Sequence, residues 1–349
     1  MSEAPRAAPR RRGPPWRAML PTLIVLALGI VWSVAWFAGA WWLDREVDEA
    51  RVRAASQGLE LRCAEDGIEG YPFRFSFACR DAELVTPDAM LRAPRLLATI
   101  QAYDPRHMIA EIESPASIVP ARGPAIQLDW SRLLVSARTE FDRLRATLDG
   151  SSRDPLDILS EVGISADDLA IAPDGADGVS VERLTAFARP APGAAARDAE
   201  LALDAEGVAV DLAATPIRLA MRASLLDLPL ADTPDFVRRW LSDGGSIDIE
   251  RIDVAGEDAL VRTSGQIGAT PAGAPQGRLN LGFVAPSAVP GLFTDPAWRS
   301  IAASLANAVL LTGEAIEIDG RDALALDLII EGGAMRVGFL PLGTLAPLF

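Results

Sequence analysis

The chain has 349 residues, of which 50% are hydrophobic and 23% are charged, so it can bury a sizeable core in one long domain or in two halves. All 33 basic residues are arginine. Without lysine, the chain cannot carry P-loop, protein-kinase or Schiff-base chemistry. The formal net charge of −15 argues against a nucleic-acid partner.

The first predicted element is a transmembrane helix over residues 20–43. Leu20 to Leu43 is an uninterrupted apolar run without a charge, and its length suffices to cross a bilayer. Arginines precede the run and acidic residues follow it, so we expect residues 1–19 to form a cytoplasmic tail and the bulk of the chain to lie in the periplasm. The flanking residues are Arg6, Arg10, Arg11, Arg12 and Arg17 before the run, and Asp44, Glu46, Asp48 and Glu49 after it.

A cleaved signal peptide is the alternative explanation of this run. Signal peptides have a shorter apolar region, of 7 to 15 residues, that ends in a small-x-small site. Ala38 to Ala40 fits such a site weakly, but Trp41 and Trp42 follow it directly, as in the aromatic belt of a retained anchor. We therefore expect a signal anchor that stays in the inner membrane as a single pass.

The exported part is strongly acidic. Residues 1–43 carry five arginines and one glutamate, so the remainder has a net charge of about −19. This charge argues against lying flat on anionic lipid and favours a solvated acidic surface.

The sequence predicts no catalytic, cofactor-binding or metal-binding residue. His107 has no accompanying Gly-x-Ser-x-Gly motif, and we interpret it as a turn or strand-edge histidine. One histidine and two cysteines do not make a zinc site, and Asp174 to Gly178 lacks the spacing of a calcium loop, which indicates a turn. A carboxylate-dependent hydrolase is the least favoured function. Sugar-binding clefts usually contain aromatic platforms, and the only tryptophans outside the apolar run and its flank are Trp130, Trp240 and Trp298.

Beyond the run, helix-forming residues predict a juxtamembrane helix over 44–58 that ends at Gly58. From there on, apolar residues occur at every second position instead of at helical spacing, as in half-buried strands. We predict a mainly β fold with a few helices, in which a long curved antiparallel sheet or sandwich is divided into β-rich halves at 59–190 and 198–349. Alternation is clear at Phe73, Phe75, Phe77 and Cys79, and in 96–102, 108–113, 126–136, 179–184, 200–212, 217–225, 247–254, 277–284 and 323–330.

Two helices interrupt the later strands. Thr233 and Pro234 predict a capped start for a helix that ends at Gly244 and packs through an apolar stripe. Asp295 and Pro296 repeat that start. Residues 189–197 predict a linker, and residues 270–277 a hairpin loop. The stripes that we expect to pack on a sheet are Phe236, Val237, Trp240 and Leu241, and Trp298, Ile301, Leu305 and Val309.

The two cysteines predict a disulfide bond. A hairpin centred on Tyr71 would set Cys63 opposite Cys79, and Gly67, Gly70 and Pro72 supply residues that favour turns. An oxidising exported compartment favours bond formation. A redox pair and two free thiols are the weaker alternatives, because the chain has no Cys-x-x-Cys motif.

Three motifs carry a resemblance to a known family. They are Gly70-Tyr71-Pro72-Phe73-Arg74 within the segment 63–79, a hairpin from Gly265-Gln266-Ile267 to Pro275-Gln276-Gly277-Arg278-Leu279, and the ending Gly338-Phe339-Leu340-Pro341-Leu342-Gly343. In this order they resemble an uncharacterised family of proteobacterial envelope proteins, the domain of unknown function 2125. The resemblance implies an envelope location but brings no reaction, cofactor or site residue. In layout, the chain also resembles the AsmA-type envelope proteins, which look like lipid-conducting troughs.

These patterns leave two non-enzymatic functions open. The leading hypothesis is an anchored protein that binds or transfers lipid or another amphipathic ligand on an apolar sheet face, with Phe73, Phe75 and Phe77 lining or backing that face. The alternative is a structural or assembly factor that contacts another envelope protein through an edge strand. An open apolar face would favour the first function, and a closed core with a bare edge the second.

Overall fold

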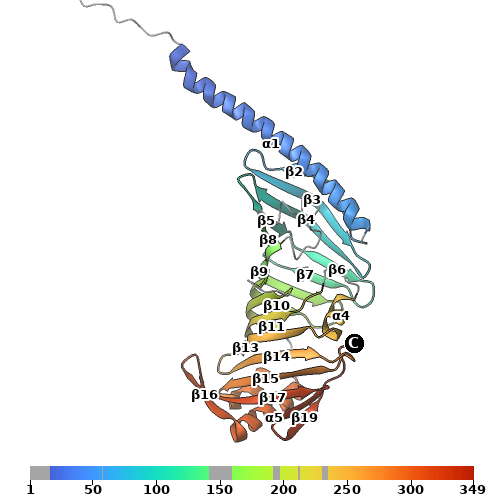
Figure 1. The fold of residues 1–349 in the computed structure, drawn as a ribbon, viewed down its shortest axis with the longest axis vertical. Coiled ribbons are helices and arrows are strands. Elements are labelled where there is room, and N and C mark those ends of the chain that lie inside the picture. Colours follow the sequence, from blue (N-terminus) through green and yellow to red (C-terminus); the bar gives the residue numbers. More distant parts are fainter. Residues whose placement is uncertain (1–15, 57, 141–158, 192–196, 211–212, 230–234) are drawn as a thin grey trace, which may run out of the picture.

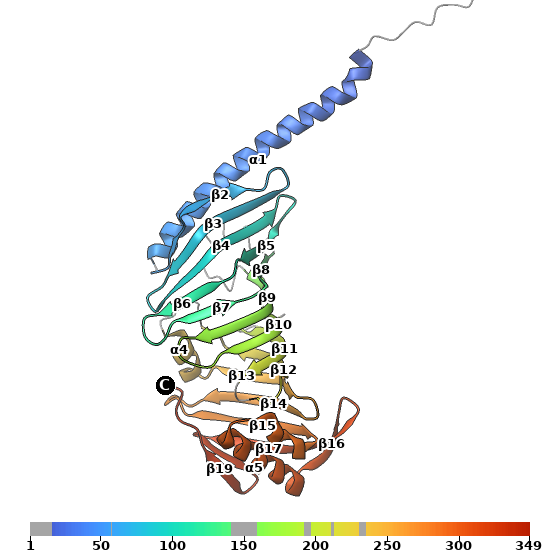
Figure 2. The same ribbon diagram turned by 180° about the vertical axis from the view of Figure 1, so that it is seen from behind.

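A computed structural model describes residues 16–349 except 57, 141–158, 192–196, 211–212 and 230–234, and the side chains of residues 16–18. The chain forms a single antiparallel sheet of 19 strands, stacked along the long axis of an elongated molecule. The helix α1 leaves from one end, and the helix α5 packs at the other, as both side views show (Figures 1 and 2). The predicted mainly β class, with an N-terminal apolar helix before a long antiparallel sheet, is confirmed.

The helix α1, Trp16–Ser56, joins the apolar run and the juxtamembrane segment in one continuous element. It ends just before Gly58, whose φ of 82° favours glycine and whose N–H donates to the carbonyl of Ala55. The part from Met19 onward is long and apolar enough to cross a membrane. Apolar side chains such as Val25 (70% exposed) and Val34 (64%) lie free on its surface, which is compatible with membrane association.

The strands alternate in direction along the chain. The N-terminal group comprises β1 (Glu60–Arg62), β2 (Glu65–Glu69), β3 (Arg74–Val85), β4 (Ala89–Gln101), β5 (Asp104–Ile112), β6 (Ala116–Pro120), β7 (Ile126–Asp129), β8 (Arg132–Thr139), β9 (Leu159–Pro173) and β10 (Val179–Pro190). The remainder are β11 (Ala199–Val210), β12 (Ile217–Leu226), β13 (Ser246–Ala255), β14 (Leu260–Ala269), β15 (Pro275–Val284), β16 (Glu314–Ile318), β17 (Arg321–Glu331), β18 (Ala334–Val337) and β19 (Leu340–Thr344). Asp174 to Gly178 connects β9 to β10, so the predicted turn is confirmed. The predicted linker over 189–197 starts too early, because Arg189 and Pro190 still pair with β11 as the end of β10, and residues 192–196 lie outside the described residues.

The sheet divides into two branches after β4 and rejoins at β9. One branch runs through β5 and β8, and the other through β6 and β7. Trp130 sits between β7 and β8, is buried, and donates its indole N–H to the carbonyl of Ile112 at 2.9 Å. The prediction of one strand over 126–136 is therefore wrong, because the chain crosses between branches at Trp130 while the apolar alternation continues on both sides.

Three helical segments accompany the C-terminal strands: α4 (Phe236–Ser242), the 3-10 helix η1 (Pro286–Leu292) and α5 (Pro296–Thr312). In α4, Trp240 and Leu241 are buried as predicted, whereas Val237 is 61% exposed. The predicted cap, Thr233 with Pro234, lies outside the described residues. The Asp295 cap of α5 is confirmed, since its carboxylate accepts from the N–H groups of Ala297 and Trp298.

The predicted apolar stripe of α5 is only half right. Val309 is fully buried and Leu305 packs on the core, but Trp298 and Ile301 are 51% and 52% exposed. Alanines 302, 306 and 308 form the buried face instead. Short side chains let a helix approach a sheet closely, so the larger residues of α5 turn outward. Trp298 stacks on Phe293, with ring centroids 6.3 Å apart.

The cysteines form the predicted disulfide between Cys63 and Cys79. The predicted hairpin register is wrong, because Cys79 pairs with Asp66 of β2, and Cys63 lies in the break between β1 and β2. The bond therefore connects the chain directly after β1 to the middle of β3, rather than two directly opposed strand residues.

Removing this disulfide by the double substitution Cys63→Ser and Cys79→Ser should lower the free energy of unfolding by about 3 kcal/mol, because the bond closes a loop of about 15 residues. Denaturant midpoints of the oxidised and substituted chains measure the loss, and the reduced wild-type chain is the matched control. Alkylation without reductant should leave both cysteines unlabelled. Free labelling of both would contradict the bond.

Candidate functional site

One face of the sheet is apolar from its first strands to its last. The strand register places one residue from each of twelve strands in a single row across the sheet, and only Thr263 in that row is polar. A parallel row from Phe75 to Leu328 contains no polar side chain at all. We call this side the apolar face. The first row is Phe77, Ala98, Ala110, Val135, Ile164, Ala186, Leu203, Met221, Ile252, Thr263, Leu281 and Leu326.

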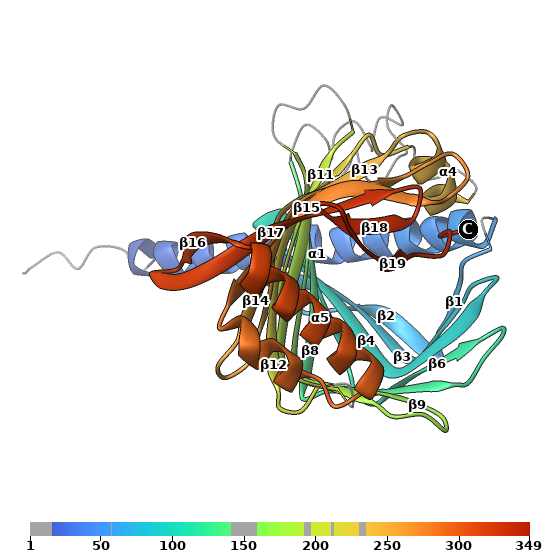
Figure 3. The ribbon, with the colours of Figure 1, turned by 90° about the horizontal axis from the view of Figure 1, so that it is seen from below.

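The two ends of the apolar face are covered by helices. At the far end, α5 and η1 close a core that contains Phe283 (1% exposed), Leu281, Leu326 and Val309. Near it, α4 covers Leu225 and Ile247 through Trp240 and Leu241. At the first strands α1 lies against the same face, as the contacts of Phe75 and Phe77 below show. Seen along the long axis, the sheet curves between these covered ends (Figure 3).

Between its ends, the apolar face is open within the described part of the chain. Met108 of β5 is 40% exposed and Ile164 of β9 is 41% exposed. The large side chains of the first row from Val135 to Ile252 are half-buried or exposed, whereas Leu281 and Leu326 are buried. Apolar side chains of a sandwich core would be buried along the whole row. The first row therefore presents an apolar surface in the middle of the sheet that no described helix covers, beside a buried cluster of Val181, Ala205 and Val208.

Local irregularities in β9 and β11 keep large apolar residues on this face. Asp168 and Gly207 have positive φ values of 53° and 63°. In β9 the residues on the apolar face have even numbers before Asp168 and odd numbers after it, and in β11 the numbers change from odd to even at Gly207. Val181, Ala205 and Val208 consequently share one cluster. A side chain at Gly207 would also meet the Glu182 carboxyl group at 2.7 Å or closer, and the positive φ adds to the preference for glycine at this position.

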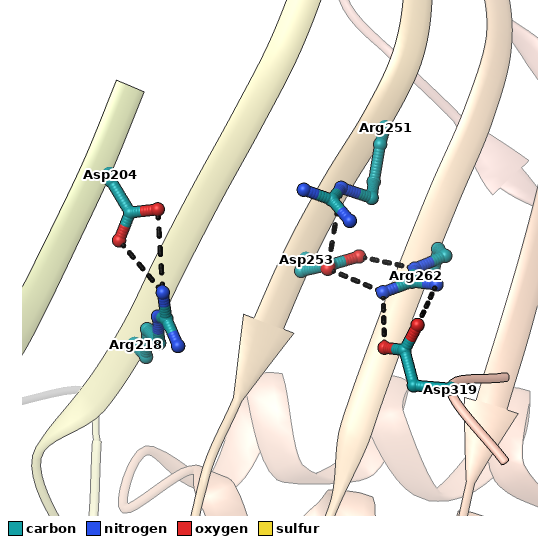
Figure 4. A network of polar contacts seen from close by, with 6 residues as sticks. All are labelled: Asp204, Arg218, Arg251, Asp253, Arg262 and Asp319. Atoms are coloured by element: carbon teal, nitrogen blue, oxygen red, sulfur yellow. Dashed lines mark hydrogen bonds and ion pairs between the residues drawn. The ribbon is translucent and has the colours of Figure 1, made fainter. Parts of the chain in front are cut away.

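The opposite face of the sheet is polar and carries networks of ion pairs. Arg262 of β14 donates to Asp253 of β13 at 2.7 Å and to Asp319 at 2.8 Å (Figure 4). The hydrogen bond from Arg262 lowers the pKa of Asp319, and the two carboxylates raise the pKa of Arg262. Arg218 and Asp204 form a similar pair at 3.2 Å on β12 and β11. Because strand residues alternate between faces, these charges point away from the apolar face.

His107 lies on the polar face, in the middle of β5. It lies in a strand rather than in a turn and pairs with Arg138 of β8, whereas the register between β4 and β5 shifts beside it and gives it no paired residue in β4. It lines a shallow cavity of about 190 Å³ with Thr99, Asp104 and Glu111. Among the described residues, no group of three or more histidine, cysteine, aspartate or glutamate side chains could hold a metal ion.

The three predicted phenylalanines lie at the end of the sheet that α1 contacts. Phe75 stacks on Trp36 of α1 with ring centroids 5.3 Å apart, and the guanidinium of Arg51 lies 5.1 Å from the centre of the Phe77 ring. Both are on the apolar face, beneath α1. Phe73 lies in the turn before β3 and is 65% exposed.

The open middle of the apolar face consists of residues that sequence reasoning did not single out. Met108 and Ile164 are the most exposed of its large side chains, and β9, which carries Ile164, was not among the predicted strands. The signal was present in β9 as Val162, Ile164 and Ala166 in alternation. Their position opposite Ala137, Val135 and Leu133 depends on the register and is visible only in the fold.

Comparison with known proteins identifies a family. The family model described as "Uncharacterized protein conserved in bacteria (DUF2125)" matches residues 36–346. No curated protein and no solved structure matches the chain. The matched segment begins inside α1 and extends over all 19 strands. The chain therefore belongs to the uncharacterised bacterial family DUF2125, as its three motifs predicted.

Proposed function

We propose that this protein is a non-enzymatic envelope protein that is held in the inner membrane by α1 and binds or transfers lipid, or another amphipathic ligand, on the open part of its apolar face in the periplasm. The observation that carries the proposal is the continuous apolar row, which is half-buried or exposed from Ala98 to Thr263. Uncovered apolar surface of this extent is unfavourable in water and is stabilised when acyl chains cover it.

Contacts between α1 and the sheet support retention of the helix as an anchor. Trp36 is 6% exposed, stacks on Phe75 and donates its indole N–H to the carbonyl of Arg74 at 3.1 Å. Cleavage after Ala40 would remove Trp36 and expose the ring of Phe75. The segment that a signal peptidase would discard therefore belongs to the folded structure.

Residues on opposite faces of the same strand provide the test of this proposal. A photoreactive amino acid in place of Met108 or Ile164 should crosslink to lipid in cells, because both positions lie on the open apolar face. The same amino acid at Glu111 or Asp167 should give at most a background signal, since these residues lie on the opposite face of β5 and β9. Mass spectrometry of the crosslinked adducts identifies the bound molecule.

The outcomes separate the alternatives. Lipid adducts at Met108 and Ile164 but not at Glu111 and Asp167 would support the proposal. Protein adducts alone at the apolar positions would overturn it in favour of an assembly factor, the second function that the sequence leaves open. Equal lipid adducts on both faces would show contact with the membrane surface rather than a binding face.

A further inference from the structure

The hairpin between β2 and β3 packs on a part of α1 that lies deep inside the apolar run. The indole N–H of Trp32 donates to the carbonyl of Pro72 at 2.9 Å, and the hydroxyls of Ser33 and Tyr71 are 2.7 Å apart. Tyr71 also stacks on Phe37, with ring centroids 5.6 Å apart. The hairpin tip is therefore level with the middle of the run, far from its charged end at Asp44.

The rise of an α-helix gives the distance of this position below the charged end of the run at Asp44. Trp32 precedes Asp44 by twelve residues, which is about 18 Å along the axis at a rise of 1.5 Å per residue. Even a helix tilted by about 40° would place Trp32 roughly 14 Å below the level of Asp44. Asp44 lies in the headgroup layer, which is about 5–7 Å thick, and one leaflet contributes about 15 Å of hydrocarbon, so the tip lies within the outer leaflet when α1 spans the membrane.

The backbone carbonyls at the tip are hydrogen-bonded within the protein and need no water. The carbonyls of Pro72 and Arg74 accept from the indoles of Trp32 and Trp36, and the carbonyl of Phe73 accepts from the N–H of Ala102 at 3.0 Å. Non-helical backbone at membrane depth is tolerated only where its polar groups are satisfied by protein. Three consecutive carbonyls meet that condition here.

The side chains of the tip are aromatic and exposed. Phe73 is 65% exposed and Tyr71 51%. Tyr103, in the neighbouring loop between β4 and β5, is 76% exposed, and the bond between Ala102 and Phe73 holds the two loops together. Aromatic residues of this kind favour the boundary between headgroups and acyl chains.

We propose that these two loops, residues 70–73 and 102–103, insert into the outer leaflet of the inner membrane. The apolar face then begins inside the leaflet, so that acyl chains reach it laterally. The charged residues next to the loops are paired, which lowers the cost of placing them close to acyl chains: Asp104 pairs with Arg106 at 3.0 Å, and Glu69 with Arg95 at 2.9 Å. The contact is apolar and needs no anionic lipid, which agrees with the acidic charge of the exported part. This inference rests on the proposed anchoring by α1.

Depth-dependent fluorescence quenching tests the insertion in the full chain, reconstituted into nanodiscs of phosphatidylcholine. Single cysteines at Phe73, Tyr103, Val34 and Phe339 each carry an NBD fluorophore, while the native cysteines are protected by their disulfide. Val34 lies on the exposed surface of α1, and Phe339, which is 95% exposed, lies at the far end of the molecule. Nitroxide on the acyl chains should quench F73C and Y103C at least threefold more than F339C. Iodide in the buffer should instead quench F339C more than F73C and Y103C.

The two control positions separate the inference from the function it rests on. If F73C and Y103C respond to iodide as F339C does while V34C is quenched by the acyl nitroxide, α1 spans the bilayer, the anchor stands, and the loop insertion is wrong. If V34C is also quenched by iodide and spared by the nitroxide, α1 does not span the bilayer, so the insertion and the proposed anchoring are both wrong. Quenching of F73C but not Y103C would overturn insertion of the second loop.

Discussion

Replacing Met108 and Ile164 together with aspartate should lower the amount of co-purifying lipid at least tenfold while the sheet stays folded. A carboxylate that acyl chains would cover loses its hydration without gaining a partner, which costs more than the roughly 1.4 kcal/mol that corresponds to a tenfold change in affinity. Both positions are about 40% exposed in the absence of ligand, so the charges remain hydrated in the free protein and folding is little affected. Quantitative mass spectrometry of lipid per mole of purified protein measures the effect.

The matched control places aspartate on the other face of the same strands. His107→Asp and Ser165→Asp adjoin Met108 and Ile164 in sequence but point to the polar face, so they should retain wild-type lipid content. Lipid that associates with α1 is common to all the variants and cancels in the comparison. Wild-type lipid content in the double aspartate variant, with an unchanged melting curve, would exclude the apolar face as the binding surface.

The second large effect concerns the covered end of the same face. Phe283→Ala should lower the free energy of unfolding by about 3–5 kcal/mol, because Phe283 is 1% exposed in the core beneath α5 and η1 and its removal leaves a cavity. Ile164→Ala should cost about 1 kcal/mol or less, since its side chain is already 41% exposed. Denaturant midpoints of the two variants in detergent provide the measurement.

These two substitutions distinguish an open face from a closed one. If Ile164→Ala were as destabilising as Phe283→Ala, the middle of the sheet would be covered in solution, and binding of a ligand there would require displacement of whatever covers it. A large loss at Phe283 with a small loss at Ile164 would show that the apolar face is part of a hydrophobic core only at its end.

Much of the local structure could be predicted from the residues because its causes are local. The length of an uncharged run predicts α1, the Asp295-Pro296 pair predicts the start of α5, and alternation predicts most of the strands. The disulfide followed from two cysteines in a chain that we expect to be exported, although its hairpin register did not. Trp130 shows the limit: a residue that connects two branches of the sheet has the same alternating neighbours as one inside a continuous strand.

The residues of the candidate site could not be predicted, because whether an apolar side chain is covered depends on helices that lie far from it in the sequence. Phe75, Ile164 and Leu281 all belong to alternating strands, yet the first lies under α1, the second is open and the third is buried under α5. In α5, the choice between Trp298 and Ala302 as the packed residue depends on how closely the helix approaches the sheet, and both fit a helical stripe.

By itself, the sequence determined the N-terminal apolar helix, the antiparallel strands and the presence of an apolar side on each strand, because charge, hydrophobicity and period act over a few residues. The tertiary structure alone decided that eleven register steps align those sides into one surface. It also decided that, among the described residues, helices cover this surface at its two ends, and that a hairpin tip lies level with the middle of the apolar run of α1. Register and packing join residues far apart in the chain, and their free energies depend on contacts that no local pattern contains.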